Sequence, residues 1–351
     1  MSNQTLSWKP PTFPPTTVEN DGTAVNRYDV RSTLTHLVSH RDNVNNVYML
    51  YYITTKDGRK FHLNTNCGMA GSELQGTFVS LNDLQTLTAR GASTIGPGKG
   101  STELLQWEGT VQSITAPTDG DKWTNTNMKI DFEGVKLDVI IKPTGGNFYY
   151  GGNGAICLDP RGPDLDPSVN IPGWSWYWAN PTTLIEGSLT IDGEEHEIDT
   201  SESFALFERQ WGNFDCRPLY FALWGWLETG EVFIVWGLKP TLEGRFTRGF
   251  CSVWHPGGMH EMIPIGPDSV CSDLEASPRT GIKYFNKFFI DLPARNSSIT
   301  FTKWIRDAEL APAPPVKQYI TISESYGEGT CEWNGKTVRF FGHAEQLGGP
   351  E

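Results

Sequence analysis

Hydrophobic and polar residues alternate with a period of two along most of this chain, in short runs punctuated by 37 glycines and 23 prolines. A period of two places successive side chains on opposite faces of a strand, so the pattern predicts β-strands and indicates an all-β sandwich or barrel. Only residues 80–88 look helical. The strands expected from the pattern cover residues 47–54, 60–64, 104–114, 128–132, 136–141, 183–191, 195–199, 220–227, 231–238, 282–292, 298–305, 319–324 and 337–342.

Tight turns join several of these runs into hairpins. Asp57-Gly58 separates the first two runs, and Asp192-Gly193 separates a later pair. Asp-Gly pairs supply the left-handed backbone that a tight hairpin needs. Neighbouring strands are therefore expected to pair antiparallel.

The chain of 351 residues is long enough for two ordinary domains or one large β architecture. A stretch rich in proline and glycine, residues 159–173, separates two halves of similar strand density. We therefore expect an all-β protein built from two packed antiparallel β-barrels or sandwiches. Its expected parts are an irregular segment over residues 1–25, an N-terminal barrel over residues 26–165 and a C-terminal barrel over residues 174–351.

The most informative stretch is residues 207–214, Phe-Glu-Arg-Gln-Trp-Gly-Asn-Phe, in which Glu208 and Arg209 lie within an aromatic run. A charge in an apolar interior costs several kcal/mol or more unless it is paired, or unless the carboxyl keeps its proton. On one strand these two side chains face opposite sides, so they cannot pair with each other. Two interpretations stay open. Both charges are architectural, or Glu208 points into a barrel lumen and donates a proton.

Aromatic residues surround this stretch in the sequence. Tryptophans 174, 176 and 178 repeat with a period of two, as do Trp224 and Trp226, and Trp236 follows. Core packing is the commoner use of such residues. The alternative is a cavity wall, where aromatic faces stabilise a cation by about 0.5–2 kcal/mol. Tyr149 and Tyr150, within a glycine-rich segment, either supply hydroxyls to a site or form a barrel rim.

The charge balance restricts the partners. A net charge of −13 without clustered lysine or arginine argues against nucleic acid and anionic membrane surfaces. No window approaches 18 apolar residues, so no membrane span is expected. The N-terminus has no basic segment followed by an apolar core, which predicts a cytoplasmic protein, with secretion as the open alternative.

Several kinds of chemistry lack their sequence signals. The six cysteines form no C-x-x-C pair and no cluster with histidine at zinc spacing, so no metal is expected. The chain has no G-x-S-x-G elbow, no phosphate-binding loop and no dinucleotide fingerprint. The chain therefore lacks the usual signs of a hydrolase or of a cofactor-dependent redox enzyme.

One family shares these features in the same order. The strings "NPTTLIEGSLTIDG", "FALFERQWGNF", "ALWGWLETGEVFIVWGLKP" and "YITISESYGEGTCEWNGKTVRFFGHAEQL" resemble the carotenoid hydratase and kievitone hydratase superfamily. The fungal lipocalin-like Diels–Alderases are more distant relatives of the same kind. The resemblance covers roughly residues 45–347 and is most specific at residues 205–213 and at the C-terminal glutamates Glu324 and Glu345. It implies two lipocalin-like β-barrels.

The resemblance further implies cofactor-free chemistry on a hydrophobic prenyl, polyene or polyketide substrate in natural-product biosynthesis. The family acid falls on Glu208, which would protonate an alkene or epoxide, giving hydration, cyclisation or rearrangement. Arg209 would order the neighbouring strands or hold an acidic partner, and Asp215 and Glu324 are second choices for acid or base. The substrate-binding residues expected are Tyr149, Tyr150, Trp176, Trp178, Trp211, Trp224, Trp226 and Trp236.

Two other functions fit the same pocket. A pericyclase would shape a polyene for cycloaddition without an acid. A lipocalin-like carrier would bind a hydrophobic ligand and convert nothing. The His and Tyr/Asp partners of bacterial carotenoid hydratases have no evident counterpart in this sequence, so a carotenoid substrate is not expected.

Overall fold

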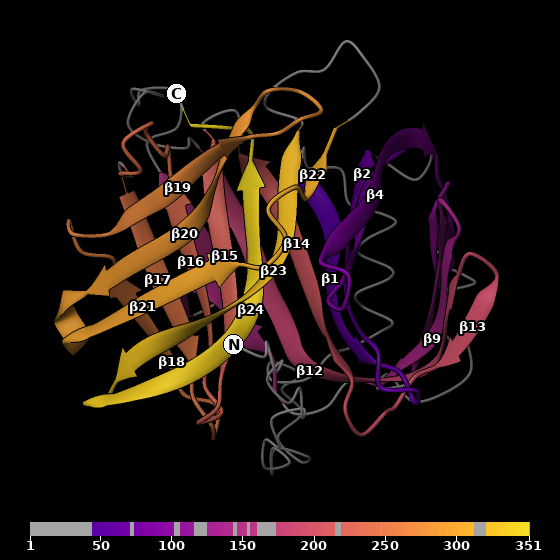
Figure 1. The fold of residues 1–351 in the computed structure, drawn as a ribbon, viewed down its shortest axis with the longest axis horizontal. Helices are drawn as coiled ribbons and strands as arrows, with labels where there is room; N and C mark the ends of the chain where they lie inside the picture. The colour runs from indigo at the N-terminus through magenta and orange to yellow at the C-terminus, as the bar shows by residue number, and fades with distance from the viewer. Residues whose placement is uncertain are drawn as a thin grey trace.

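The structure, a computed structural model, describes residues 44–70, 74–101, 106–115, 125–142, 146–152, 155–159, 173–214, 219–246, 248–311 and 321–350 (Figure 1). Within these ranges the strands form two antiparallel sheets, and helix is limited to the 3₁₀ turns η2 (Tyr150–Gly152) and η4 (Pro293–Arg295). The all-β prediction with two packed barrel-like sheets is confirmed. Nowhere in the described chain is a helix long and apolar enough to cross a membrane.

The first sheet curls until its ends nearly meet. Its order in the described chain is β4-β3-β2-β1-β14-β12-β9-β8-β7-β6-β5, with β10, β11 and β13 also paired to β12. The two edge strands, β4 and β5, follow each other in the chain and are separated only by Gly98. The edges of the sheet must therefore lie close together, which makes a nearly closed barrel.

The strands of the first sheet have these bounds: β1 (Val44–Thr54), β2 (Lys60–Ala70), β3 (Leu74–Asp83), β4 (Thr88–Pro97), β5 (Lys99–Ser101), β6 (Gln106–Glu108), β7 (Gln112–Thr115), β8 (Thr126–Phe132), β9 (Val135–Lys142), β10 (Phe148–Tyr149), β11 (Ala155–Asp159), β12 (Gly173–Ile191), β13 (Glu194–Glu197) and β14 (Phe204–Phe214).

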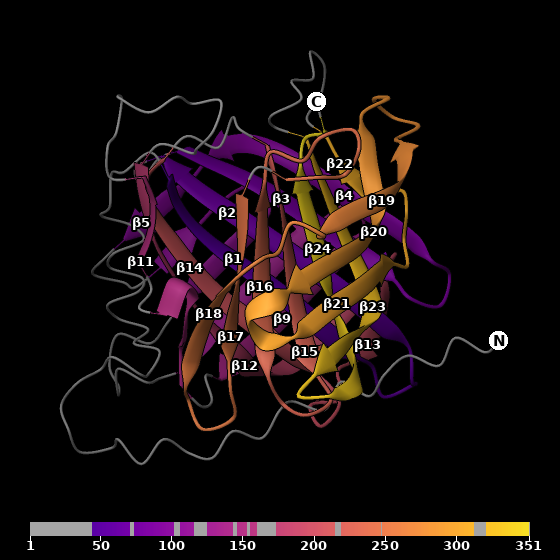
Figure 2. The ribbon, with the colours of Figure 1, turned by 90° about the vertical axis from the view of Figure 1, so that its left-hand side faces the viewer.

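The second sheet lies against the first, with its strands crossing the face of β1 and β14 (Figure 2). Its order in the described chain is β18-β17-β16-β15-β24-β23-β21-β20-β19, with β22 paired to β23. Its strands are β15 (Tyr220–Leu227), β16 (Val232–Leu238), β17 (Arg248–Trp254), β18 (His260–Pro264), β19 (Val270–Ala276), β20 (Lys283–Leu292), β21 (Ser297–Lys303), β22 (Glu309–Leu310), β23 (Ile322–Trp333) and β24 (Lys336–Leu347).

Two expectations about the layout need correction. The sheets divide between β14 and β15, and not within residues 159–173, because β12, β13 and β14 pair into the first sheet. Residues 80–88 are not helical but form the end of β3, a turn and the start of β4. The Asp83 carboxylate accepts hydrogen bonds from the backbone N–H groups of Gln85 and Thr86, and this local bonding favours a turn over a helix.

Among the described residues, three large hydrophobic cores hold the molecule together, and a small fourth cluster contains Leu310, Ile322 and Leu347. One fills the first barrel and includes Phe207, and another fills the curl of the second sheet. The third lies between the two sheets and includes Leu206 and Trp224. All residues of β16 are buried, because one face of that strand packs inside its own sheet and the other face meets the neighbouring sheet.

A row of glycines lets the second sheet curl at its centre. Gly225, Gly342 and Gly327 lie directly opposite one another on β15, β24 and β23. A Cβ atom on Gly342 would lie 2.0 Å from the backbone carbonyl oxygen of Trp224. Phenylalanine rings of adjacent strands cover the other two positions, which fills the space that the missing side chains leave.

We predict that Gly342→Ala destabilises the protein by at least about 2 kcal/mol, because rigid backbone blocks the new methyl group. Chemical denaturation measures the loss. Gly76→Ala is the matched control in β3, where a Cβ would meet nothing within 4 Å. The control should change the free energy of unfolding by no more than about 0.5 kcal/mol. Equal losses in both variants would contradict the role given to Gly342.

Candidate active site

Glu208 lies between the two sheets. One interpretation of the sequence placed this side chain in a barrel lumen, and that location is wrong. It is 2% exposed and projects from β14 on the face that carries Leu206, toward the second sheet. Its Oε2 accepts hydrogen bonds from the Tyr150 hydroxyl at 2.6 Å and from the Trp224 indole N–H at 3.1 Å. Tyr177 also hydrogen-bonds to this carboxyl.

Burial is the dominant influence on this carboxyl. It raises the pKa of Glu208 to about 8, and the negative charge of Glu345 adds to the increase. The donors on Tyr150, Tyr177 and Trp224 act in the opposite direction, because they stabilise the carboxylate. The carboxyl therefore keeps its proton at neutral pH, as required of a Brønsted acid.

The second sheet contributes a pair of carboxyls to the same interface. Glu324 on β23 and Glu345 on β24 are directly opposite in register, so their side chains emerge on the same face. Both are buried, and burial raises the pKa of each well above its ordinary value. The Tyr220 hydroxyl donates to Glu345 Oε1 at 2.6 Å.

Two histidines and a tyrosine connect these groups. His343 Nε2 lies 2.6 Å from Glu324 Oε2, and His343 Nδ1 lies 2.7 Å from His62 Nε2. The Tyr48 hydroxyl lies 2.9 Å from His343 Nε2 and 3.2 Å from Glu324 Oε2. The ring of Tyr48 stacks on Trp224 at 5.3 Å, which joins the Glu208 group to the Glu324 group.

Several residues expected from the sequence come together here. Tyr150 and Trp224 touch Glu208, and Glu324 lies across the interface. Trp236 is buried nearby and contacts Tyr177 edge-on at 5.6 Å. These residues come from both sheets, so the site exists only when the sheets are packed together.

Other expected residues lie on the opposite face of the first sheet. Arg209 is buried and donates hydrogen bonds to the side chain of Asn45 and to the carbonyl oxygens of Asn46 and Gln210. Arg209 thereby ties β1 to β14, in agreement with the strand-ordering role. It lies on the face of the sheet opposite Glu208. Its guanidinium lies 5.1 Å from the ring of Trp211.

The tryptophan repeat on β12 also differs from the expected wall. Trp178 packs with Phe207 in the core of the first barrel. The residue that alternation turns toward Glu208 is Tyr177, which the sequence analysis left out of the site. The side chain of Trp176 lies outside the described residues.

The remaining expected residues are not part of this cluster. The indole of Trp226 donates to the carbonyl of Pro181 and stacks on Phe341, at a different place in the interface. Tyr149 is partly exposed, and its backbone N–H donates to His260. Asp215 lies outside the described residues.

Sequence reasoning missed four residues that complete the cluster, Tyr48, His62, Tyr177 and His343. Tyr48 and Glu324 are 276 positions apart in the chain, so spacing could not bring them together. The available signal was a histidine within a strand, as at His62 between Phe61 and Leu63 in β2 and at His343 between Gly342 and Ala344 in β24.

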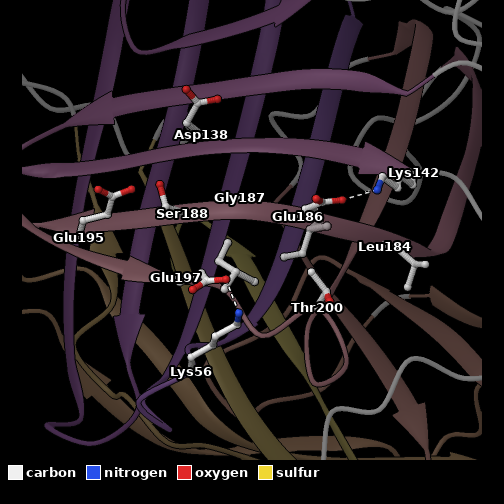
Figure 3. Close-up of a pocket in the computed structure, with 12 residues that line it drawn as sticks. Lys56, Asp138, Lys142, Leu184, Glu186, Gly187, Ser188, Glu195, Glu197 and Thr200 are labelled. Atoms are coloured by element: carbon white, nitrogen blue, oxygen red, sulfur yellow. Dashed lines mark hydrogen bonds and ion pairs between the residues drawn. The ribbon is translucent and has the colours of Figure 1, made fainter.

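A separate groove of about 1040 Å³ lies among exposed residues of β9, β12 and β13 (Figure 3). Ion pairs between Lys56 and Glu197 and between Lys142 and Glu186 line it. These pairs are exposed, and such pairs contribute little. The titratable residues that line the groove are exposed or half-buried, whereas the interface cluster holds buried ones, so the interface cluster is the candidate site.

Metal ligation finds no support in the part of the chain that the structure describes. There, no group of three or more His, Cys, Asp or Glu residues is arranged to hold a metal ion.

Comparison with solved structures identifies the fold. Kievitone hydratase from Nectria haematococca aligns over 99% of both chains with a TM-score of 0.76 and 17% identity. The protein has the fold of kievitone hydratase. A proposed AttH protein from Nitrosomonas europaea aligns over 88% of this chain and 94% of its own, with a TM-score of 0.71 and 15% identity.

The predicted resemblance is thus confirmed at the level of the fold. CghA with Sch210972 is more distant, with a TM-score of 0.46 and 10% identity over 88% of each chain, and does not bear on function. No protein-family model matches the sequence, and no curated protein matches it closely enough to count as a relative.

The raised pKa of Glu208 predicts a pH-dependent stability difference between the protein and Glu208→Gln. The folded state holds a proton that the unfolded state releases between pH 4.5 and about 8. Stability from this group therefore falls as pH rises through that window, by about 1.4 kcal/mol per pH unit. Because Gln cannot ionise, we expect Glu208→Gln to gain stability relative to the original protein across the window.

Denaturant titrations at several pH values measure this difference. Glu309→Gln is the control, since Glu309 is also buried and accepts hydrogen bonds from Ser277, Thr280 and Tyr284, but lies outside the site. A difference for Glu208→Gln that does not change with pH would show that this carboxyl is not held neutral.

Proposed function

We propose that the protein is an enzyme that protonates an alkene or epoxide of a hydrophobic small molecule, with Glu208 as the Brønsted acid. The products would arise by hydration, cyclisation or rearrangement, in natural-product biosynthesis. The observation that supports this most directly is a carboxyl 2% exposed between two barrels, bonded by Tyr150 and Trp224, whose burial raises its pKa to about 8.

The bonding of Glu208 favours proton release at one oxygen. Because Oε2 accepts from both Tyr150 and Trp224, the proton of the neutral acid belongs on Oε1. When that proton moves to a substrate carbon, the two donors stabilise the carboxylate that remains. Burial therefore keeps the proton on Glu208, and the two donors are already in place to stabilise the carboxylate when the proton leaves.

The walls of the site suit the cation that such a transfer produces. Tyr48, Trp224 and Tyr177 present aromatic rings around the acid. Aromatic faces stabilise nearby positive charge by about 0.5–2 kcal/mol. The indole N–H of Trp236, buried with no acceptor among the described residues, can donate to an oxygen of the bound molecule.

The reaction balances without an added oxidant or reductant. Glu208 gives a proton to carbon, and water or a hydroxyl of the substrate adds its oxygen to the cation and loses a proton in turn. Return of a proton to Glu208 completes the cycle. The shared fold with a hydratase agrees with this class of reaction, although the residues of the site carry the proposal and not the fold.

We predict that conversion of an alkene substrate in D₂O places one deuterium on a carbon of the product, because the Glu208 proton exchanges with solvent. Kievitone is the first compound to test, followed by a panel of prenylated and polyene molecules, with products analysed by mass spectrometry and NMR. Glu208→Gln should lower kcat by about 10²–10⁴-fold while ligand affinity changes little. Glu309→Gln should keep full activity.

Three results would contradict the proposal. Full activity of Glu208→Gln would remove this residue from the mechanism. A product cyclised from a polyene that has no epoxide, formed without deuterium on carbon, would indicate a pericyclase. Binding of these compounds without conversion of any of them would indicate a carrier.

A further inference from the structure

The two histidines at the interface have no part in proton transfer from Glu208, yet they are fully buried. His62 on β2 and His343 on β24 contact each other across the two sheets. Burial lowers the pKa of His62 well below its ordinary value and that of His343 to about 3. Both rings are therefore neutral near pH 7, and each carries a single N–H.

The hydrogen-bond partners determine which nitrogen carries that proton. His62 Nδ1 lies 3.1 Å from the carbonyl oxygen of Tyr51, which only accepts, so Nδ1 must be the donor. His62 Nε2 is then an acceptor, and the contact of 2.7 Å requires His343 Nδ1 to donate to it. His343 Nε2 is left without a proton.

The same reasoning places a proton on Glu324. His343 Nε2 and Glu324 Oε2 are 2.6 Å apart, and two acceptors at that distance would repel each other. Because Nε2 has no proton, Glu324 must supply it as a neutral carboxylic acid. The only lone pair of Nε2 is then occupied, so the Tyr48 hydroxyl donates to a carboxyl oxygen, either of Glu324 or of Glu345.

The series of bonds ends at a group that cannot take up a proton. It runs from Glu324 through His343 and His62 to the carbonyl of Tyr51, and an amide oxygen is not a base near neutral pH. The proton on Glu324 therefore has no exit along these bonds. Glu324 also shares a hydrogen bond with Glu345, its cross-strand neighbour.

We propose that Glu345 is the base of this site, and that His343 and His62 are positioning residues that lock its cross-strand neighbour Glu324 in the neutral state. This inference rests on the proposed function. Glu345 would accept the proton that the adding water or hydroxyl loses, while Glu208 supplies the proton that goes to carbon. Exchange of a proton from Glu345 back to Glu208 then resets both groups.

The surroundings of Glu345 favour it over Glu324 for this role. A charge on Glu324, or a hydrogen bond from Glu345 to it, would raise the pKa of Glu345. With Glu324 neutral that charge is absent, and the hydroxyls of Tyr220 and Tyr48 stabilise the Glu345 carboxylate. On Glu324 itself, Lys303, Asn64 and Tyr48 oppose the effect of burial on the pKa. Glu208 faces Glu345 from the first sheet. Glu345 is 4% exposed and its donor Tyr220 is partly exposed, whereas Glu324 is completely buried.

Nitrogen-15 NMR of histidine side chains tests the lock without a substrate. We expect both rings to be neutral and protonated on Nδ1 near pH 7. His62→Gln should keep the His343 tautomer, because an amide can accept from His343 and donate to Tyr51, whereas His62→Leu should lose it. An imidazolium signal from either ring near neutral pH would overturn the lock, since it would mean an ionised Glu324.

Infrared difference spectra assign the two carboxyls, also without a substrate. Glu324→Gln should remove an acid carbonyl band that does not change with pH over the range in which the protein stays folded. Glu345→Gln should remove a band that does change. The reverse assignment would overturn the role given to Glu345.

Turnover then separates this inference from the proposed function. With a substrate found in the D₂O experiment, Glu345→Gln should lower kcat by about 10²–10⁴-fold and remove one limb of the pH profile, against less than about tenfold for Glu324→Gln. Equal losses in the two variants would exclude Glu345 as the specific base. Failure of Glu208→Gln to lose activity would defeat the proposed function, while the two spectroscopic results would still decide the lock.

Discussion

Removal of three carboxyls from water between two sheets is the constraint on which the rest of this structure depends. Glu208, Glu324 and Glu345 are each 4% exposed or less, and burial raises the pKa of all three. An ionised carboxylate in such a place costs several kcal/mol unless it is compensated, so Glu208 retains its proton and the three groups are bonded by phenol, indole and imidazole. The sheets would have to separate to hydrate these groups. Protonation and packing of the interface are therefore coupled, and a reactive acid is kept at the expense of stability at higher pH.

The two-sheet architecture makes this arrangement possible. Each sheet curls around a core of its own, so the outer faces of β1, β14, β15 and β24 are available to form a third, partly polar core. The glycine row at Gly225, Gly342 and Gly327 lets the second sheet bend, while Trp224 and His343, the neighbours of Gly225 and Gly342, face the first sheet. Alternation along each strand thus assigns one face to stability and the other to the site.

The sequence predicted the class of fold and the burial of Glu208 better than it predicted the arrangement around that residue. Alternation is a local property, so it correctly indicated strands and correctly separated Glu208 from Arg209. It does not say which face of a strand meets another sheet, and for that reason Trp178 was assigned to the site in place of Tyr177. The proline and glycine content of residues 159–173 predicts a boundary between two domains. The first sheet nevertheless includes β12, β13 and β14, which follow this stretch in the chain. His62 and His343, 281 positions apart, carry no local pattern that would connect them.

The placement of the proposed acid and base on different sheets has a consequence for stereochemistry. Glu208 projects from β14 of the first sheet and Glu345 from β24 of the second, and the two face each other across the interface closely enough for the charge of one to raise the pKa of the other. A flat double bond held between the sheets would receive its proton from one wall and its oxygen nucleophile from the other. The two new bonds would then form on opposite faces of the alkene, which is anti addition. If both groups were on one strand, they would instead deliver proton and nucleophile to the same face. The division of the site between two sheets therefore explains the exclusion of water from Glu208, and in the proposed reaction it would set the two groups on opposite sides of the alkene.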